Sequence, residues 1–275
     1  MTICNRAFSS FFRKVAGLVL LVIPPAGCGD NGDSQRTTHP PPAPVPVHSV
    51  LFFDKSVSMN VATDFIRRKY EGALAGLIEQ NIRTEGDRLS VYFIHENTSK
   101  ARALQVTATA RLEDVSSLND TDAEAVRTEF EVTLQKERQR FLEQARNQLG
   151  LVNTGTSNQT TDLWATLAVL SKVAKPGETT KAYYFSDMVE SVPGPGRRDF
   201  GRLPPAGADQ AEAWAGQDAE RLRKRLDSAR LRNVQIRMVL PFEPTSSSKL
   251  NNPSVTHYWE TLFVRLGITT PAEEL

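Results

Sequence analysis

The chain is poor in cysteine, in net charge and in long apolar runs, and each shortage excludes a class of protein. Two cysteines among 275 residues are too few for a disulfide-stapled domain. Its 33 basic and 32 acidic residues nearly balance, so no basic field for nucleic acid is present. No Gly-x-Ser-x-Gly elbow, Walker loop, Cys-x-x-Cys pair or metal-spaced histidine pair occurs. The remainder, 40% apolar and 24% charged, is typical of a globular domain.

The first 27 residues have the composition of a signal peptide. Arg6, Arg13 and Lys14 precede an apolar run at residues 15–23, which is too short to span a bilayer but long enough for a signal sequence. We therefore expect residues 1–27 to lie outside the folded domain and the protein to be exported. Without them the formal charge becomes −2.

The segment Pro24-Pro-Ala-Gly-Cys28 resembles the lipobox of bacterial lipoproteins, in which the cysteine is lipidated and becomes the mature N-terminus. The resemblance implies a lipid anchor on Cys28 and a place in the bacterial cell envelope, either membrane-anchored or periplasmic. Pro25 departs from the pattern, which prefers an aliphatic residue there. Ordinary cleavage near Gly27 and an uncleaved anchor are the alternatives.

Residues 28–46 are polar and rich in proline, so they cannot form a core and favour extended polyproline II segments. We interpret them as a semi-rigid stalk. The domain is then expected at residues 47–267, with a short C-terminal tail at 268–275.

Alternating apolar runs and helical stripes predict an α/β domain. Strands are expected at residues 47–53, 88–95, 103–110, 179–186 and 234–240, and helices at 60–80, 121–149, 162–173, about 215–229 and 255–266. The strand at 103–110 alternates apolar and polar residues, which is typical of an antiparallel edge. This order favours a Rossmann-like, doubly wound sheet that is mostly parallel, with one antiparallel edge strand and helices on both faces.

The first strand ends in Asp54, and Ser56 and Ser58 follow at every second position. If the chain stays extended through the turn, all three side chains point to one side, where their oxygens can converge. One carboxylate with hydroxyls suits a hard divalent cation such as Mg²⁺. The same residues also suit the N-terminal cap of the helix that follows, and the motif alone favours neither interpretation.

Two further polar positions are expected near the same edge of the sheet. A polar loop at residues 153–163 leads into a helix and presents Thr161, with Thr160 as its competitor, and Asp187 follows the fourth strand. In open α/β sheets, ligands bind outside the carboxyl ends of the strands.

The ordered set resembles the metal ion-dependent adhesion site of von Willebrand factor A domains, over about residues 47–267. That family has the pattern Asp-x-Ser-x-Ser, a later Thr, and an Asp after the fourth strand, often as Ser-Asp-Gly. The corresponding residues here are Asp54, Ser56, Ser58, Thr161 and Asp187. Met188 replaces the usual Gly, and the interval before Thr161 is long because of the helix at 121–149.

The resemblance implies that these five residues hold a divalent cation, Mg²⁺ before Mn²⁺ or Ca²⁺, directly or through water. It also implies a protein partner that contributes an acidic side chain to the metal. We therefore expect a non-enzymatic, cation-dependent binding module in the cell envelope. One alternative is a metal-dependent phosphohydrolase using Asp54, although Ser56 stands where haloacid dehalogenase-like enzymes usually have a second Asp. The other is an envelope scaffold with a silent metal site, whose helix at 121–149 binds partners.

Overall fold

A computed structural model describes residues 44–56, 59, 64–152, 159–243 and 251–275. The predicted signal peptide, Cys28, most of the stalk and Ser58 lie outside these residues. The described part belongs to one compact unit, Ala43–Leu275. Among the described residues, no helix is long and apolar enough to cross a membrane.

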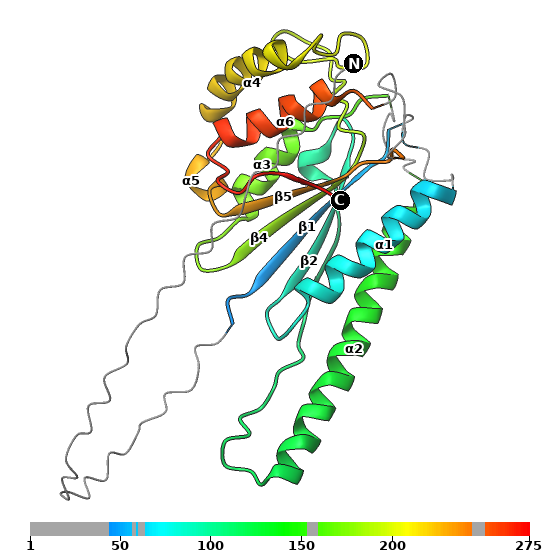
Figure 1. Cartoon of the computed structure of the whole chain (residues 1–275), viewed down its shortest axis with the longest axis vertical. Helices are drawn as coiled ribbons and strands as arrows, with labels where there is room; N and C mark the ends of the chain where they lie inside the picture. The colour runs from blue at the N-terminus through cyan, green and yellow to red at the C-terminus, as the bar shows by residue number, and fades with distance from the viewer. Residues whose placement is uncertain (1–43, 57–58, 60–63, 153–158, 244–250) are drawn as a thin grey trace, which may run out of the picture. The chain divides into compact units, whose positions relative to one another are not determined.

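A six-stranded sheet in the order β3-β2-β1-β4-β5-β6 forms the centre of the domain (Figure 1). The strands are β1 (Val47–Asp54), β2 (Arg88–Ile94), β3 (Arg102–Thr107), β4 (Thr179–Phe185), β5 (Val234–Val239) and β6 (Glu273–Glu274). All neighbours pair in parallel except β2 and β3, which are antiparallel. The predicted mostly parallel sheet with one antiparallel edge is confirmed.

Helices cover both faces of the sheet, as expected. The helices are α1 (Asp64–Asn81), α2 (Asp120–Gly150), α3 (Trp164–Val173), α4 (Ala208–Arg223), α5 (Ser228–Leu231) and α6 (Pro253–Arg265), with a 3-10 turn η1 (Thr98–Lys100). α1 and α2 share one hydrophobic cluster with the sheet, whereas residues of α3, α4 and α6 share the other (Figure 1). The two buried faces of β1 explain its continuous apolar run.

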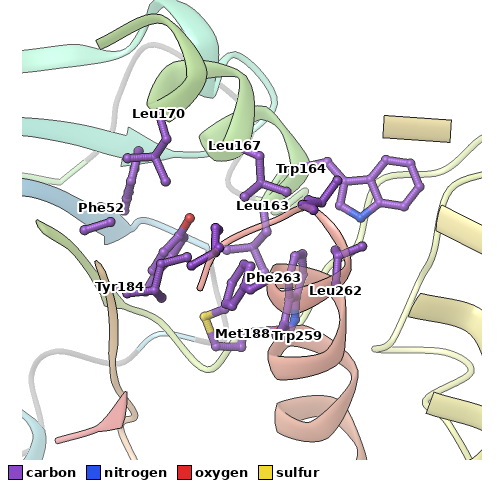
Figure 2. Close-up of a cluster of buried hydrophobic side chains, with 14 of the residues drawn as sticks. Phe52, Leu163, Trp164, Leu167, Leu170, Tyr184, Met188, Trp259, Leu262 and Phe263 are labelled. Carbon is purple, nitrogen blue, oxygen red and sulfur yellow. The ribbon is translucent and has the colours of Figure 1, made fainter. Parts of the chain in front are cut away.

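Aromatic rings fill the cluster on the α3 and α6 face. Phe52 of β1 stacks on Tyr184 of β4 with ring centroids 5.0 Å apart, and Trp259 of α6 lies 5.8 Å from Phe263 (Figure 2). These side chains are almost fully buried and fix the spacing between β1, β4 and α6. The carboxyl ends of β1 and β4 are therefore held by a rigid core.

Several predicted boundaries differ from the structure. The strand expected at 103–110 ends at Thr107, and the helix expected at about 215–229 ends at Arg223, before the separate helix α5. The sheet continues past residue 267, because Ile268 is buried in the core and β6 pairs with β5 inside the expected tail. Helix α4 begins at Ala208, earlier than the apolar stripe indicated, since its first turns bury Ala211 beside the core. Alanine carries too little apolar surface to reveal this helix start in the sequence.

A candidate metal site at the carboxyl edge of the sheet

The topology brings the ends of β1 and β4 together. The chain winds outward from β1 through β2 to β3, then returns to place β4 on the other side of β1. Such a switch in winding direction opens a crevice at the carboxyl ends of the two central strands. Asp54 ends β1 and Asp187 follows β4, so both acidic residues stand at this point.

Asp54 is buried, with 3% of its surface exposed, and its carboxylate accepts hydrogen bonds from two serines. The backbone N–H of Ser56 donates to Oδ1 at 2.8 Å, and the Ser186 hydroxyl donates to Oδ2 at 2.6 Å. The bond to Ser186 crosses from β1 to the end of β4. No Lys, Arg or His forms an ion pair with Asp54 among the residues that the structure describes.

The acidity of Asp54 reflects this lack of a counter-charge. Burial, and after it the negative charge of Asp187, raises the pKa of Asp54 from 3.8 to about 7, while hydrogen bonds from Ser186 and Ser56 act in the opposite direction. Burial and the same two carboxylates also raise the pKa of Tyr70. Asp54 and Asp187 are therefore close enough to repel each other in a site of low polarity.

A left-handed turn at Met188 shapes the end of β4. Met188 has φ of 61°, the only non-glycine residue in the described ranges with a positive φ. Its N–H donates to Ser186 Oγ at 3.0 Å, and its carbonyl accepts from the Trp259 indole at 2.8 Å. This conformation explains why a glycine suits the position, and the 1% exposed Met side chain offsets its strain by packing in the core (Figure 2).

Thr161 is buried and belongs to a segment that is tied to the chain after Asp187. The Thr161 N–H donates to the Ser191 hydroxyl at 2.8 Å, and the Ser191 N–H donates to the Thr161 carbonyl at 3.1 Å. Nearby, the hydroxyl of Thr160 is buried without a hydrogen-bond partner in the described part of the chain. Both threonines stay candidates for the predicted ligand position.

An arginine holds this segment against the loop after β4. Arg197 bonds both Glu190 and Asp162, with Asp162 at 2.7 Å, and its guanidinium lies 4.7 Å from the ring centroid of Trp164. Glu190 is fully buried, and burial raises its pKa to about 8 although Arg197 acts against that shift. Asp162 therefore holds the loop and caps α3 through Ala165 N–H.

Lys55 directs its amine away from the predicted metal ligands. Nζ donates to the carbonyls of Gln148, Leu149 and Leu151 at 3.0, 2.7 and 2.8 Å, which are free acceptors at the end of α2. Burial lowers the pKa of Lys55 to about 8, although Asp54 raises it. The residue next to Asp54 thus caps a helix, a role that the sequence did not reveal.

A cleft of about 230 Å³ opens beside Asp187. Asp187, Phe200, Asn252 and Thr256 are among the residues that line it. The cleft gives a side chain from another molecule access to the carboxyl edge of the sheet.

The donor set fits a hard divalent cation. It consists of oxygen atoms only, and the negative charge of Asp187 acts on the buried carboxylate of Asp54. No group of three His, Cys, Asp or Glu side chains in the described ranges could hold a metal, but the predicted site has only two carboxylates beside hydroxyls. Asp54, Ser56 and Asp187 lie at one edge, Thr161 joins it through Ser191, and Ser58 is outside the described residues.

Sequence reasoning missed Ser186 as the partner of Asp54 and Arg197 as the clamp of the loop. Ser186 stands directly before Asp187, so its place at a strand end was a usable signal. Arg197 gave none, because Asp162 and Trp164, which it contacts together with Glu190, lie in another segment.

Comparisons with known proteins do not identify a family. No family model matches the chain, and no curated protein matches it. A solved structure of proximal thread matrix protein 1 from the mussel byssus is similar over 82% of this chain, at 10% identity and a TM-score of 0.37. The matched region spans 47% of the length of that chain.

Proposed function

We propose that this protein is a divalent-cation-dependent protein-binding module of the von Willebrand factor A type, exported to the cell envelope. One observation carries the proposal: the buried carboxylate of Asp54, whose pKa is raised by burial and by the charge of Asp187, stands with Asp187 at the switch point of the sheet. A bound cation would neutralise both charges. Asp54, Ser56, Asp187 and Thr161 would hold it, together with Ser58 by the resemblance.

A cation held by two carboxylates and neutral hydroxyls keeps part of its positive charge. It therefore attracts an acidic side chain from a partner, which gains a charge-assisted contact. The cleft beside Asp187 gives such a side chain a route to the metal. The partner's protein surface would supply the remaining contacts.

Isothermal titration of the purified protein with Mg²⁺, Mn²⁺ and Ca²⁺ tests the metal step. We expect binding to wild type and at least a tenfold loss in Asp54→Ala, because the charge at the centre of the site is gone. Asp120→Ala is the matched control, since Asp120 is exposed in the first turn of α2 and should leave cation affinity unchanged. Equal binding by wild type and Asp54→Ala would sink the proposal.

Partner capture tests the second step. Proteins bound in Mg²⁺ should be released by EDTA and should fail to bind Asp187→Ala. If partners bind equally well with EDTA and to Asp187→Ala, the result would favour a scaffold with a silent metal site. Metal-dependent phosphatase turnover that Asp54→Asn abolishes would instead favour the hydrolase alternative.

A further inference from the structure

Helix α2 has a second side on which most residues are exposed. Its inner side packs beside α1 through Leu134, Phe141 and other buried residues. The outer side carries residues spaced alternately by four and three, which places them on one side of the helix. We call them the outer line: Thr121, Ala125, Thr128, Val132, Gln135, Gln139 and Leu142. All are exposed except Leu142, which is partly buried against the hydrophobic cluster of α1 and α2.

The outer line is uncharged although the helix is not. Twelve of its 31 residues are charged, yet none stands on the line. Val132, at its centre, is 48% exposed. A helix that only meets water carries its charges on the most exposed positions. Uncharged residues at this spacing, flanked by charges on both sides, match the charge pattern of a helix–helix seam, in which the flanking charges set the partner and its orientation.

The charges of α2 divide along its length. Residues 120–132 hold five acidic residues and one basic residue, whereas residues 133–150 hold four basic and two acidic. Two copies of α2 in parallel would set acidic against acidic and basic against basic. An antiparallel pair would bring the acidic half of each copy beside the basic half of the other, so opposite charges meet at the centre of the seam, while the like charges of Asp122 and Glu143 meet only at its two ends.

We propose that α2 is a dimerisation helix, which pairs in antiparallel orientation with α2 of a second copy of this chain along the outer line. The helix is about 46 Å long at 1.5 Å per residue, enough for three heptads of contact. Figure 1 shows that its amino-terminal half runs past the ends of the strands, so a second helix can lie along it. The proposal is independent of the metal site.

Glu129 and Lys136 give the pairing its direction. They stand seven residues apart beside the outer line, both are exposed, and neither makes an ion pair in the described part of the chain. Two helical turns separate them by about 10 Å, too far to pair with each other. In an antiparallel dimer each faces its opposite on the second copy. Arg138 is not available, because it bonds Glu79 of α1.

Sedimentation of the purified full-length protein from about 1 µM to about 1 mM tests the association. We expect a reversible monomer–dimer equilibrium that EDTA does not change. Val132→Lys should weaken it at least about tenfold, because it places a charge in the seam. Thr133→Lys, one residue along, adds the same charge to an exposed position beside the line and should leave it unchanged. A protein that stays monomeric, or equal effects of the two variants, would overturn the proposal.

Charge reversal tests the orientation. Glu129→Lys and Lys136→Glu should each weaken the dimer, since each sets like charges against each other twice in the symmetric pair. The double variant restores opposite charges only if the helices are antiparallel, so its dissociation constant should return to within about threefold of wild type at low salt. A double variant weaker than either single variant would overturn the antiparallel pairing.

Discussion

Two buried aspartates at opposite edges of the sheet differ in their hydrogen bonds and in their counter-charges. Asp87, at the amino end of β2, is fully buried and accepts from the N–H groups of Val47, Arg83 and Thr84 at 2.7, 2.8 and 3.2 Å. The guanidinium of Arg83 adds two more bonds and a full counter-charge. Asp54, at the carboxyl end of β1, has two serines and a repelling carboxylate nearby.

The two aspartates differ in whether an ion pair inside the domain neutralises them. Asp87 joins the start of β1 to the turn before β2, and Arg83 neutralises its charge. Asp54 has no ion pair among the described residues, and a bound cation would neutralise it under the function that we propose. The remaining fully buried acids follow the Asp87 pattern, since Arg198 pairs with Asp218 and Arg197 with Glu190.

Removing the structural aspartate should have the largest effect. Asp87→Ala would leave a guanidinium without its partner and three backbone N–H groups without acceptors, so we expect it to lower the free energy of unfolding by about 5 kcal/mol. Chemical denaturation in EDTA measures it. Asp54→Asn is the comparison and should cost far less, because it removes a charge that is unfavourable there. The reverse order would break the distinction between the two aspartates.

The pH dependence of stability should isolate Asp54. Because the pKa of Asp54 is raised from 3.8 to about 7 in the folded state, its contribution is complete below about pH 4 and is lost as the pH rises through about 7. In EDTA, wild type should therefore lose up to about 4 kcal/mol relative to Asp54→Asn between about pH 4 and pH 8. Saturating Mg²⁺ should cancel the loss.

Glu190 also has a raised pKa, and it titrates in wild type and in Asp54→Asn alike. Its contribution therefore cancels when the unfolding free energies of the two proteins are subtracted. Parallel pH profiles for wild type and Asp54→Asn would show that the Asp54 charge is already compensated.

A substitution of Lys55 tests whether its amine neutralises the charge of Asp54. Lys55→Met keeps the apolar stem but removes three hydrogen bonds from the end of α2, and we expect about 3 kcal/mol of destabilisation. Amide hydrogen exchange in the last turn of α2 should speed up. Mg²⁺ affinity should change by less than about threefold. Binding that tightens by tenfold or more would identify Lys55 as the hidden counter-ion of Asp54.

The turn at Met188 should give the smallest effect. Met188→Gly relieves a left-handed backbone but empties a buried site beside Trp259, so we expect a net loss of about 2 kcal/mol with cation affinity unchanged. Met188→Val is the contrasting variant, because a β-branched side chain resists a positive φ and should also disturb Ser186 and Asp187. Titration calorimetry distinguishes them. Equal cation affinity in both variants would show that the turn does not position the carboxylate.

The sequence predicted the strands because buried strands carry apolar runs of definite length. It missed β6, since Glu273 and Glu274 have no such pattern and their place depends on returning to β5, where Glu273 bonds Arg237 at 3.0 Å. At the site, Asp54 and Asp187 were predictable from the ends of strands. The roles of Lys55 and Arg197 were not, because they depend on contacts between segments that no local pattern encodes.

The capping of α2 by Lys55 has a consequence for the order in which the domain assembles. The carbonyls that receive its amine lie 93 to 96 residues further along the chain. During synthesis, Lys55 therefore emerges well before the helix end that it caps, and the site cannot reach its final form before α2 docks. Fragments that end before Gly150 should carry the Asp54 motif without a settled conformation.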